Sequence, residues 1–437
     1  MQDKVVMNKN DFAKKPPMGW NSYDCFGHAV DEDEFKANVD YIADNLKDYG
    51  WEYCVVDFCW SYPKKGEIYA PSQKFENGKF DVELCLDEWG RPIPAHSKFP
   101  SANGSFKYLA DYCHQRGLKF GIHLMRGIPR QAVEYKLPIK GASGITADMV
   151  ISGEDCEWLN HNKGMDMDSA GAQEFLDSIF EQYAEWEVDY IKLDDASRPY
   201  TAGRRKEVEG YHKAIMKTGR EMVLSLSPGA ISSKTAPIEE AEHLIKYSNA
   251  WRIKDDVWDD SRHLRDIFPI AKKWVPFIGS GHYPDCDMLP IGRLLKCGGF
   301  GGERDSRLTE NEKEMMLTLW AFVRSPLMMG GHLPESRESD LKYFKQKEII
   351  DINQNSTENR IMIDRAKYQL WGAKVGNKEY ESHFNIARCG LPKTIRINVC
   401  EGERIFDVWS GKEIKVKRGK ARVFVKPMSV RLIRKEK

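Results

Sequence analysis

The sequence predicts a (β/α)8 TIM barrel followed by a smaller antiparallel β-sandwich. From residue 18 onward, short apolar runs alternate with segments of helical period about eight times, the number of units that closes a barrel. Residues 357–437 instead show short alternating runs joined by Gly, Asn and Lys turns, which indicates antiparallel strands. The chain of 437 residues has room for both parts. The predicted boundary separates a catalytic barrel, residues 1–354, from an all-β domain, residues 355–437.

The elements of the barrel follow from local periodicity. Apolar residues spaced three and four apart predict helices over residues 31–49, 106–116, 170–186, 204–220 and 312–329. Runs rich in β-branched and aromatic residues predict buried strands over residues 51–59, 118–125, 188–193 and 222–227, and another that ends at Trp251. Residues 60–105 are rich in Pro, Gly and charge, so we expect a long loop there.

Composition narrows the class of partner. Lys plus Arg and Asp plus Glu both number 66, so the net charge of zero predicts no basic face for nucleic acid or a membrane, and a neutral ligand is expected. The ten cysteines form no CxxC pair, and no segment approaches 18 uninterrupted apolar residues. The N-terminus lacks an apolar leader, so we expect a cytoplasmic protein as written, or a periplasmic or secreted one if a leader was removed. The sequence leaves open whether the chain forms a homo-oligomer.

The stretch VDYIKLDDASRP, residues 188–199, organises the rest of the chain. Its apolar half predicts a buried strand, and Asp194 and Asp195 stand where that strand ends. In barrels of strand-helix units, the carboxyl ends of the strands carry the catalytic groups. The alternative is an Asp pair that only caps the next helix.

Carboxylates also follow three other predicted strands. Asp57, Asp256 and Asp287 would meet Asp194 at one rim of a closed barrel. Two such carboxyl groups are what glycoside hydrolysis needs, ~5 to 5.5 Å apart for retention and ~6.5 to 9.5 Å for inversion. The alternative for any one of them is a solvated loop charge, but Lys192, Arg252 and Trp20 at matching strand ends favour a shared site.

Seven segments, in order and spacing, resemble glycoside hydrolase family 27, the α-galactosidase and α-N-acetylgalactosaminidase group of clan D. They are PPMGWNSYDCFG, VVDFCW, GLKFGIH, DYIKLDD, WRIKDDVWDD, YPDCDMLPIG and LWAFVRSPLMMGG. The resemblance spans roughly residues 16–353, and the β-rich tail fits the C-terminal antiparallel domain of that family.

The resemblance implies a role for each matching residue. Asp194 takes the place of the nucleophile and Asp256 that of the acid/base, in a double displacement that retains anomeric configuration and uses no metal or cofactor. Lys192, two residues before Asp194 on the same strand face, can hold Asp194 ionised. The positions that line the sugar pocket in that family are occupied here by Trp20, Asp57, His123, Lys192, Arg252 and Asp287.

Three departures from the family pattern bear on substrate and compartment. Many members carry a second Asp where this chain has Phe58, and that Asp helps to hold the sugar O4 and O6 hydroxyls. Ala196 replaces a Cys that often forms a disulfide near the nucleophile, which makes a reducing compartment plausible. Ser227 stands where galactosidases often place a Glu that holds the 2-hydroxyl, and Ala230 is also small.

Three functions remain open. The first is an exo-acting retaining enzyme that removes terminal α-D-galactosyl or α-N-acetylgalactosaminyl residues from a small oligosaccharide or glycoside; the small Ser227 favours the N-acetylated sugar. The second is a β-L-arabinopyranosidase on the same scaffold, which Phe58 favours because a pentopyranose lacks the C6 hydroxymethyl group. The third is a non-catalytic carbohydrate-binding protein, against which the presence of both Asp194 and Asp256 argues.

Overall fold

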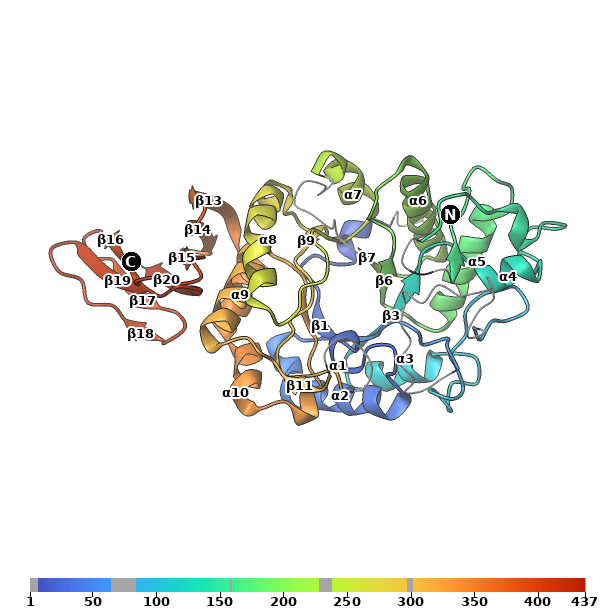
Figure 1. Cartoon of the computed structure of the whole chain (residues 1–437), viewed down its shortest axis with the longest axis horizontal. Coiled ribbons are helices and arrows are strands. Elements are labelled where there is room, and N and C mark those ends of the chain that lie inside the picture. Colours follow the sequence, from blue (N-terminus) through green and yellow to red (C-terminus); the bar gives the residue numbers. More distant parts are fainter. Residues whose placement is uncertain are drawn as a thin grey trace, which may run out of the picture.

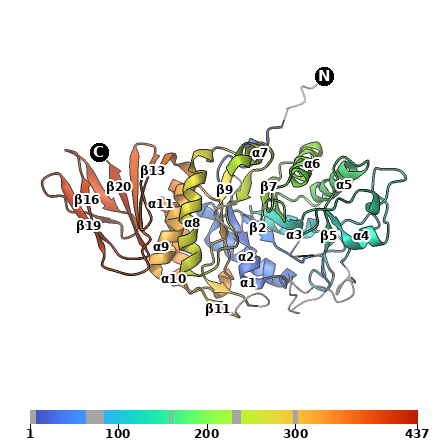
Figure 2. The same cartoon turned by 45° about the horizontal axis from the view of Figure 1, so that its top comes forward.

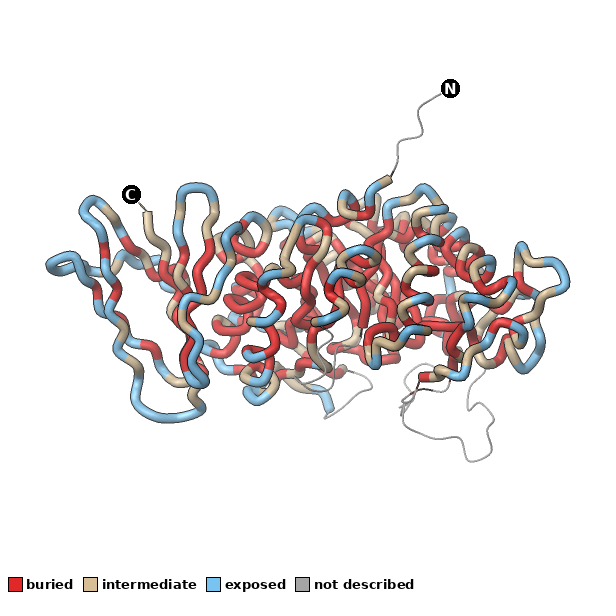
Figure 3. The backbone as a smooth tube through the Cα atoms, turned by 90° about the horizontal axis from the view of Figure 1, so that it is seen from above, coloured by how far each residue is buried: buried red, intermediate tan, exposed pale blue. Residues whose placement is uncertain are grey.

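The structure, a computed structural model, describes residues 7–63, 84–156, 159, 161–227, 238–296 and 302–436. Strands between residues 18 and 329 form a ring that helices surround, and the C-terminal strands lie together to one side of it (Figure 1). The tube in Figure 3 shows that buried residues are concentrated in this central ring. None of the helices in the described ranges is both long and apolar enough to cross a membrane.

The central sheet contains eight parallel strands in the order β12-β1-β2-β3-β6-β7-β8-β9. Each is short and almost wholly buried, as strands covered on both faces must be. Their bounds are β1 Met18–Asn21, β2 Tyr53–Val56, β3 Lys119–Met125, β6 Tyr190–Asp194, β7 Val223–Leu226, β8 Ala250–Arg252, β9 Tyr283–Asp285 and β12 Leu327–Met329.

Backbone hydrogen bonds at Leu289 join the last strand to the first. The Leu289 amide donates to the Met328 carbonyl at 2.7 Å, and the Gly330 amide donates to the Leu289 carbonyl at 3.0 Å. These bonds bring the chain just beyond β9 against β12, so the sheet closes on itself. The predicted (β/α)8 barrel is confirmed.

Helices cover the outside of the barrel. Two of them begin with a capping box, in which Asp31 pairs with Glu34 and Thr309 with Glu312. The helices are α1 Tyr23–Phe26, α2 Glu32–Asn45, α3 Lys107–His114, α4 Arg130–Glu134, α5 Ala172–Glu185, α6 Ala202–Thr218, α7 Ala241–Tyr247, α8 Ser261–Trp274, α9 Glu310–Val323, α10 Glu338–Leu341 and α11 Lys347–Asn355. Short strand pairs add β4 Ile128–Pro129 with β5 Asn162–Lys163, and β10 Arg293–Leu294 with β11 Arg304–Asp305.

The prediction of one helix over residues 312–329 is wrong at its C-terminal end. Helix α9 stops at Val323 because Arg324 adopts a left-handed conformation, with φ of +52°. Pro326, which lacks an amide hydrogen, prevents the helix from resuming. Residues Leu327–Met329 are β12, the barrel strand that pairs with β1.

The C-terminal part is antiparallel throughout. Six strands form one sheet in the order β13-β14-β15-β20-β17-β18, and β16 pairs with β19 in a second sheet. Their bounds are β13 Thr357–Arg365, β14 Tyr368–Val375, β15 Lys378–Asn385, β16 Lys393–Asn398, β17 Arg404–Asp407, β18 Lys412–Glu413, β19 Lys420–Val425 and β20 Ser429–Glu436. The change from helices to antiparallel strands at residue 356 agrees with the change of pattern in the sequence. The division into two domains at residues 354 and 355 stays a prediction.

Side chains join this part to the helices of the barrel, beside which it lies in both views (Figures 1 and 2). The rings of Phe268 and Phe384 pack edge to face with centroids 5.0 Å apart. The Trp409 indole donates to the Thr318 hydroxyl at 3.0 Å. Arg434 pairs with Glu348 at 2.7 Å. Both apolar and polar contacts therefore cross from one part to the other.

Candidate active site

A cavity lies inside the barrel and is lined by residues of its strands and of the segments that follow them. Four of the residues predicted for the site line it, namely Lys192, Ser227, Arg252 and Asp287. Sequence reasoning missed other lining residues, among them Asn21, Tyr190 and Asp285. All belong to, or directly follow, the barrel strands, so the convergence of strand ends explains why residues far apart in sequence share one space.

Asp194, the last residue of β6, has both carboxylate oxygens engaged. His123 Nε2, on the neighbouring strand β3, lies 3.1 Å from Oδ2, and the Asp195 amide donates to Oδ1 at 2.8 Å. Burial alone would raise the pKa of Asp194, but the hydrogen bond from His123 and the charge of Lys192 lower that pKa to about 2. Asp194 is therefore ionised at neutral pH, as a carboxylate nucleophile must be.

Lys192 lies between two carboxylates. Its ammonium donates to Asp57 Oδ2 at 2.9 Å, and the Asn21 amide donates to the same oxygen at 2.6 Å. Burial would lower the pKa of Lys192, but Asp57 and Asp194 hold it above its usual value. Burial likewise opposes ionisation of Asp57, yet Lys192 and His123 lower the pKa of that carboxyl. The three charges stabilise one another inside the barrel.

Arg252, the last residue of β8, joins two further acids. Its guanidinium lies 3.1 Å from Asp256 Oδ1 and 2.7 Å from Asp287 Oδ1. Asp256 has 59% of its side chain exposed and Asp287 only 9%. Burial raises the pKa of Asp287 to about 7 despite Arg252, with Asp256 and Asp285 adding to the rise. Asp256 thus stands on the solvent side of the group, where it can exchange protons with water.

Trp20 does not reach the cavity. It is fully buried, its ring packs against Phe26 and Phe35, and its indole donates to the Gly331 carbonyl at 2.9 Å. Tyr23, three residues later, lies at the site instead. Burial and the charges of Asp256, Asp57 and Asp194 all raise the pKa of its hydroxyl.

Further contacts fix the Tyr23 ring. Lys192 Nζ is 5.5 Å from the ring centroid, and the Trp258 ring packs at 6.4 Å. The signal for Tyr23 in the sequence is its position just past the end of β1, where side chains can turn into the site.

Phe58 forms a wall beside Asp57. The Phe58 ring is 5% exposed and packs edge to face on His123, with centroids 5.3 Å apart, while the Phe58 amide donates to Asp57 Oδ1 at 2.7 Å. A second cavity is lined by Phe58, His123 and Tyr62 among others. An apolar ring therefore lies directly beside the Asp57 carboxylate.

Ser227 directly follows β7 and is fixed through its backbone. Its amide donates to the Leu193 carbonyl at 2.8 Å, and its carbonyl accepts from the Ala196 amide at 2.9 Å. Ala230, the other small residue of the predicted 2-position, lies outside the described residues. The cysteines of the described ranges are free.

Two arginines hold Asp195, the residue after Asp194. Asp195 has φ of +58°, a conformation that costs a residue with a Cβ about 1–2 kcal/mol. Arg126 donates to its carbonyl at 3.1 Å and its carboxylate at 3.0 Å, and Arg204 donates to its carbonyl at 2.9 Å. Glu207 in turn accepts from Arg126. This buried network fixes the amide that donates to Asp194.

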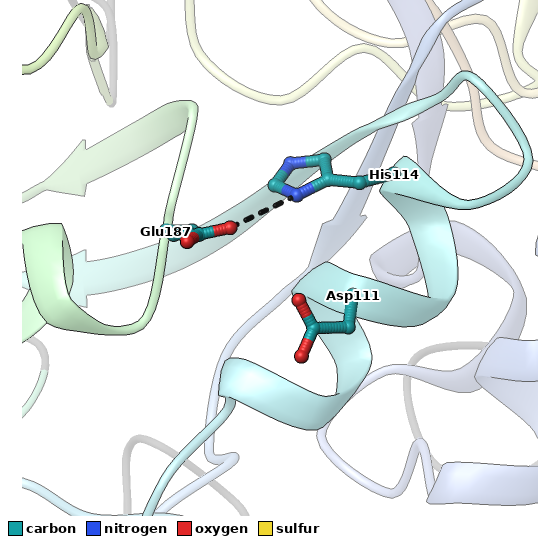
Figure 4. Close-up of side chains that lie close together, drawn as sticks. All are labelled: Asp111, His114 and Glu187. Atoms are coloured by element: carbon teal, nitrogen blue, oxygen red, sulfur yellow. Dashed lines mark ion pairs between the residues drawn. The ribbon is translucent and has the colours of Figure 1, made fainter.

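A separate cluster lies at the far end of β6 from Asp194 (Figure 4). Asp111 and His114 from α3 approach Glu187, with 3.5 Å between His114 Nδ1 and Glu187. Lys107 forms ion pairs with both carboxylates, and His114 Nε2 lies 2.7 Å from Asp189. The carboxylates of this cluster are thus already paired with a protein cation, Lys107.

Comparison with known proteins identifies the family. Residues 163–355 match the family model described as Alpha galactosidase A. A β-L-arabinopyranosidase of family 27 from Geobacillus stearothermophilus is 37% identical, with a TM-score of 0.90 over 99% of this chain and all of that one. The chain belongs to glycoside hydrolase family 27.

Other relatives are named for different activities. A putative α-N-acetylgalactosaminidase from Bacillus halodurans is 36% identical, with a TM-score of 0.83 over 96% of this chain and 97% of that one. The α-N-acetylgalactosaminidase of Mus musculus is 26% identical over 94% of this chain and 89% of its own length. The family 27 relatives are glycoside hydrolases, but their names do not agree on one sugar.

Proposed function

We propose that this protein is a retaining exo-glycosidase in which Asp194 is the nucleophile and Asp256 the acid/base. The observation that carries the proposal is Asp194 itself, which is partly buried at a strand end and kept ionised by His123 and Lys192. Asp256 supports it, because this carboxyl is on the solvent side and is oriented by Arg252.

In the first step, an Asp194 oxygen forms a bond to the anomeric carbon as the bond to the leaving oxygen breaks. Asp256 gives its proton to that leaving oxygen. In the second step, Asp256 takes a proton from water, the water oxygen attacks the anomeric carbon, and Asp194 leaves. Arg252 and Lys192 stabilise the carboxylates that these steps regenerate.

For the sugar, the geometry favours a β-L-arabinopyranoside. This pentose has the ring and hydroxyl configuration of α-D-galactose but lacks the C6 hydroxymethyl group. Asp57 supplies a carboxylate for a ring hydroxyl, while Phe58 fills the space beside it with an apolar ring and offers no acceptor for O6. The 37% identical Geobacillus relative is named for this activity.

A second candidate is an α-N-acetylgalactosaminide. Ser227 lines the same cavity as Arg252 and leaves space where a Glu would crowd a 2-acetamido group. The Bacillus halodurans relative carries that putative activity.

Aryl glycosides of β-L-arabinopyranose, α-D-galactose and α-N-acetylgalactosamine test these alternatives. We expect kcat/KM to be highest for the arabinopyranoside. Phe58→Ala should shift the ratio of arabinopyranoside to galactoside toward galactoside by at least tenfold, the ~1–3 kcal/mol scale of a pocket contact. Phe277→Ala, at the opposite end of the barrel after α8, is the matched control. A wild type that prefers galactoside, or a ratio unmoved by Phe58→Ala, contradicts the arabinopyranoside proposal.

A further inference from the structure

The neutral net charge of the chain conceals a strongly basic C-terminal part. Residues 391–437 contain 14 Lys and Arg but only five Asp and Glu. Four of these cations, Lys393, Arg396, Lys420 and Arg422, lie on β16 and β19, at the end of the molecule away from the barrel (Figure 1). The expectation that net neutrality leaves no basic face is therefore wrong for this surface.

The outer face of the β16–β19 pair is defined by Arg396, Lys420, Arg422, Phe424 and Lys426, all of them exposed. The intervening residues of β19 point the other way, because Ala421, Val423 and Val425 are buried. Ala421 and Val423 pack with Ile405 of β17 and Ile433 of β20. The inner face thus attaches the pair to the larger sheet, and the outer face is left to solvent.

Two arginines stand opposite each other on this outer face. Arg396 and Arg422 are direct cross-strand partners, a placement at which like charges repel. Within the described residues neither has an ion pair with a carboxylate, although Arg404 and Arg431 nearby do. Lysines on an edge strand can prevent edge-to-edge association. That purpose does not require two cations directly facing each other.

The remaining side chains extend the row. Successive residues on one face of a strand are ~7 Å apart, so Lys420, Arg422, Phe424 and Lys426 form a nearly straight line. Phe424 is 55% exposed in the middle of these cations. An aromatic ring among cations fits a polymer that alternates apolar ring faces with negative charges.

We infer that the outer face of the β16–β19 pair binds an acidic polysaccharide, a chain of uronic acid units. Arg396, Arg422 and the lysines would pair with carboxylates, and Phe424 would stack on a sugar face. The choice of a sugar polymer over another polyanion rests on the proposed glycosidase function, since binding the polymer would raise the local concentration of its glycosidic branches at the active site.

The test measures retardation of the full chain in gels that contain polygalacturonate, with the methyl-esterified polymer as the uncharged comparison. We expect retardation by the acidic polymer alone, and at least tenfold weaker binding for the double variant Arg396→Gln with Arg422→Gln. Arg365→Gln with Lys367→Gln removes equal charge from the β13–β14 turn, so this control should bind within about twofold of wild type. Phe424→Ala should also weaken binding.

Several outcomes would overturn the inference. They are no retardation of wild type, equal weakening in both double variants, and equal binding of single-stranded DNA or anionic phospholipid vesicles with the same loss in the Arg396 and Arg422 variant. Hydrolysis of the aryl glycosides is measured on every variant and should not change. Weaker polymer binding by the Arg396 and Arg422 variant with intact hydrolysis would assign polymer binding to this surface. Absence of aryl glycoside hydrolysis by the wild type would instead contradict the proposed function.

Discussion

Replacing His123 with Phe should raise the pKa of Asp194, the proposed nucleophile. Phe keeps a ring of similar volume in a position that is 3% exposed, but it removes the hydrogen bond to Asp194 Oδ2. Burial then acts on Asp194 with less opposition, because His123 supplies the largest lowering effect while Lys192 and the Asp195 amide remain. We expect the pKa to rise from about 2 toward the usual range of an Asp carboxyl, with a loss of stabilisation of the ionised carboxylate on the order of 1–3 kcal/mol.

The assay is the pH dependence of kcat/KM for an activated aryl glycoside, measured in brief jumps to between about pH 2.5 and 6. The acid limb should move upward in His123→Phe and stay in place in His96→Phe, an exposed control. The stabilisation that ionised Asp194 gives the fold is present above about pH 4 and is lost as pH falls toward 2. An acid limb that does not move would refute the assignment of His123 as the group that holds Asp194 ionised.

Three further substitutions test the remaining roles. Asp194→Asn should reduce turnover by several orders of magnitude with an unchanged circular dichroism spectrum, and near-normal turnover would exclude Asp194 as the nucleophile. Asp256→Ala should impair poor leaving groups far more than activated ones, with azide rescuing turnover; equal loss without rescue would contradict the acid/base role. Ser227→Glu should shift kcat/KM from N-acetylgalactosaminide toward galactoside by ~1–3 kcal/mol, and an unchanged ratio of the two constants would mean that this residue does not read the 2-substituent.

The barrel and its central acids were predictable because both follow from the pattern of apolar runs along the chain. Apolar runs that end in Asp57 or Asp194 indicate a buried strand and its carboxyl end directly. Trp20 could not be placed this way, because β1 has four residues and all four are buried, so no polar alternation shows which side chains face the axis. The structure turns Trp20 toward Phe35 and leaves Tyr23 to reach the site.

Two other features could not be derived from hydrophobic periodicity or from total charge. Strand β12 follows α9 with apolar residues that continue the helical spacing, so the left-handed Arg324 that separates them has no signal in periodicity. Arg396 and Arg422 face each other because of the register between β16 and β19, and this register cannot be derived from the total charge of the chain.

The buried network around Asp195 has a consequence for how this chain can change. Arg126, Asp195, Arg204 and Glu207 come from three segments, and losing one partner leaves another charge buried without compensation, at a cost of about 3–5 kcal/mol. A single replacement would consume much of the stability of an ordinary domain. These four positions can therefore be exchanged only as a set. Remodelling the loop after Asp194 requires redesign of helix α6 and of the end of β3 at the same time.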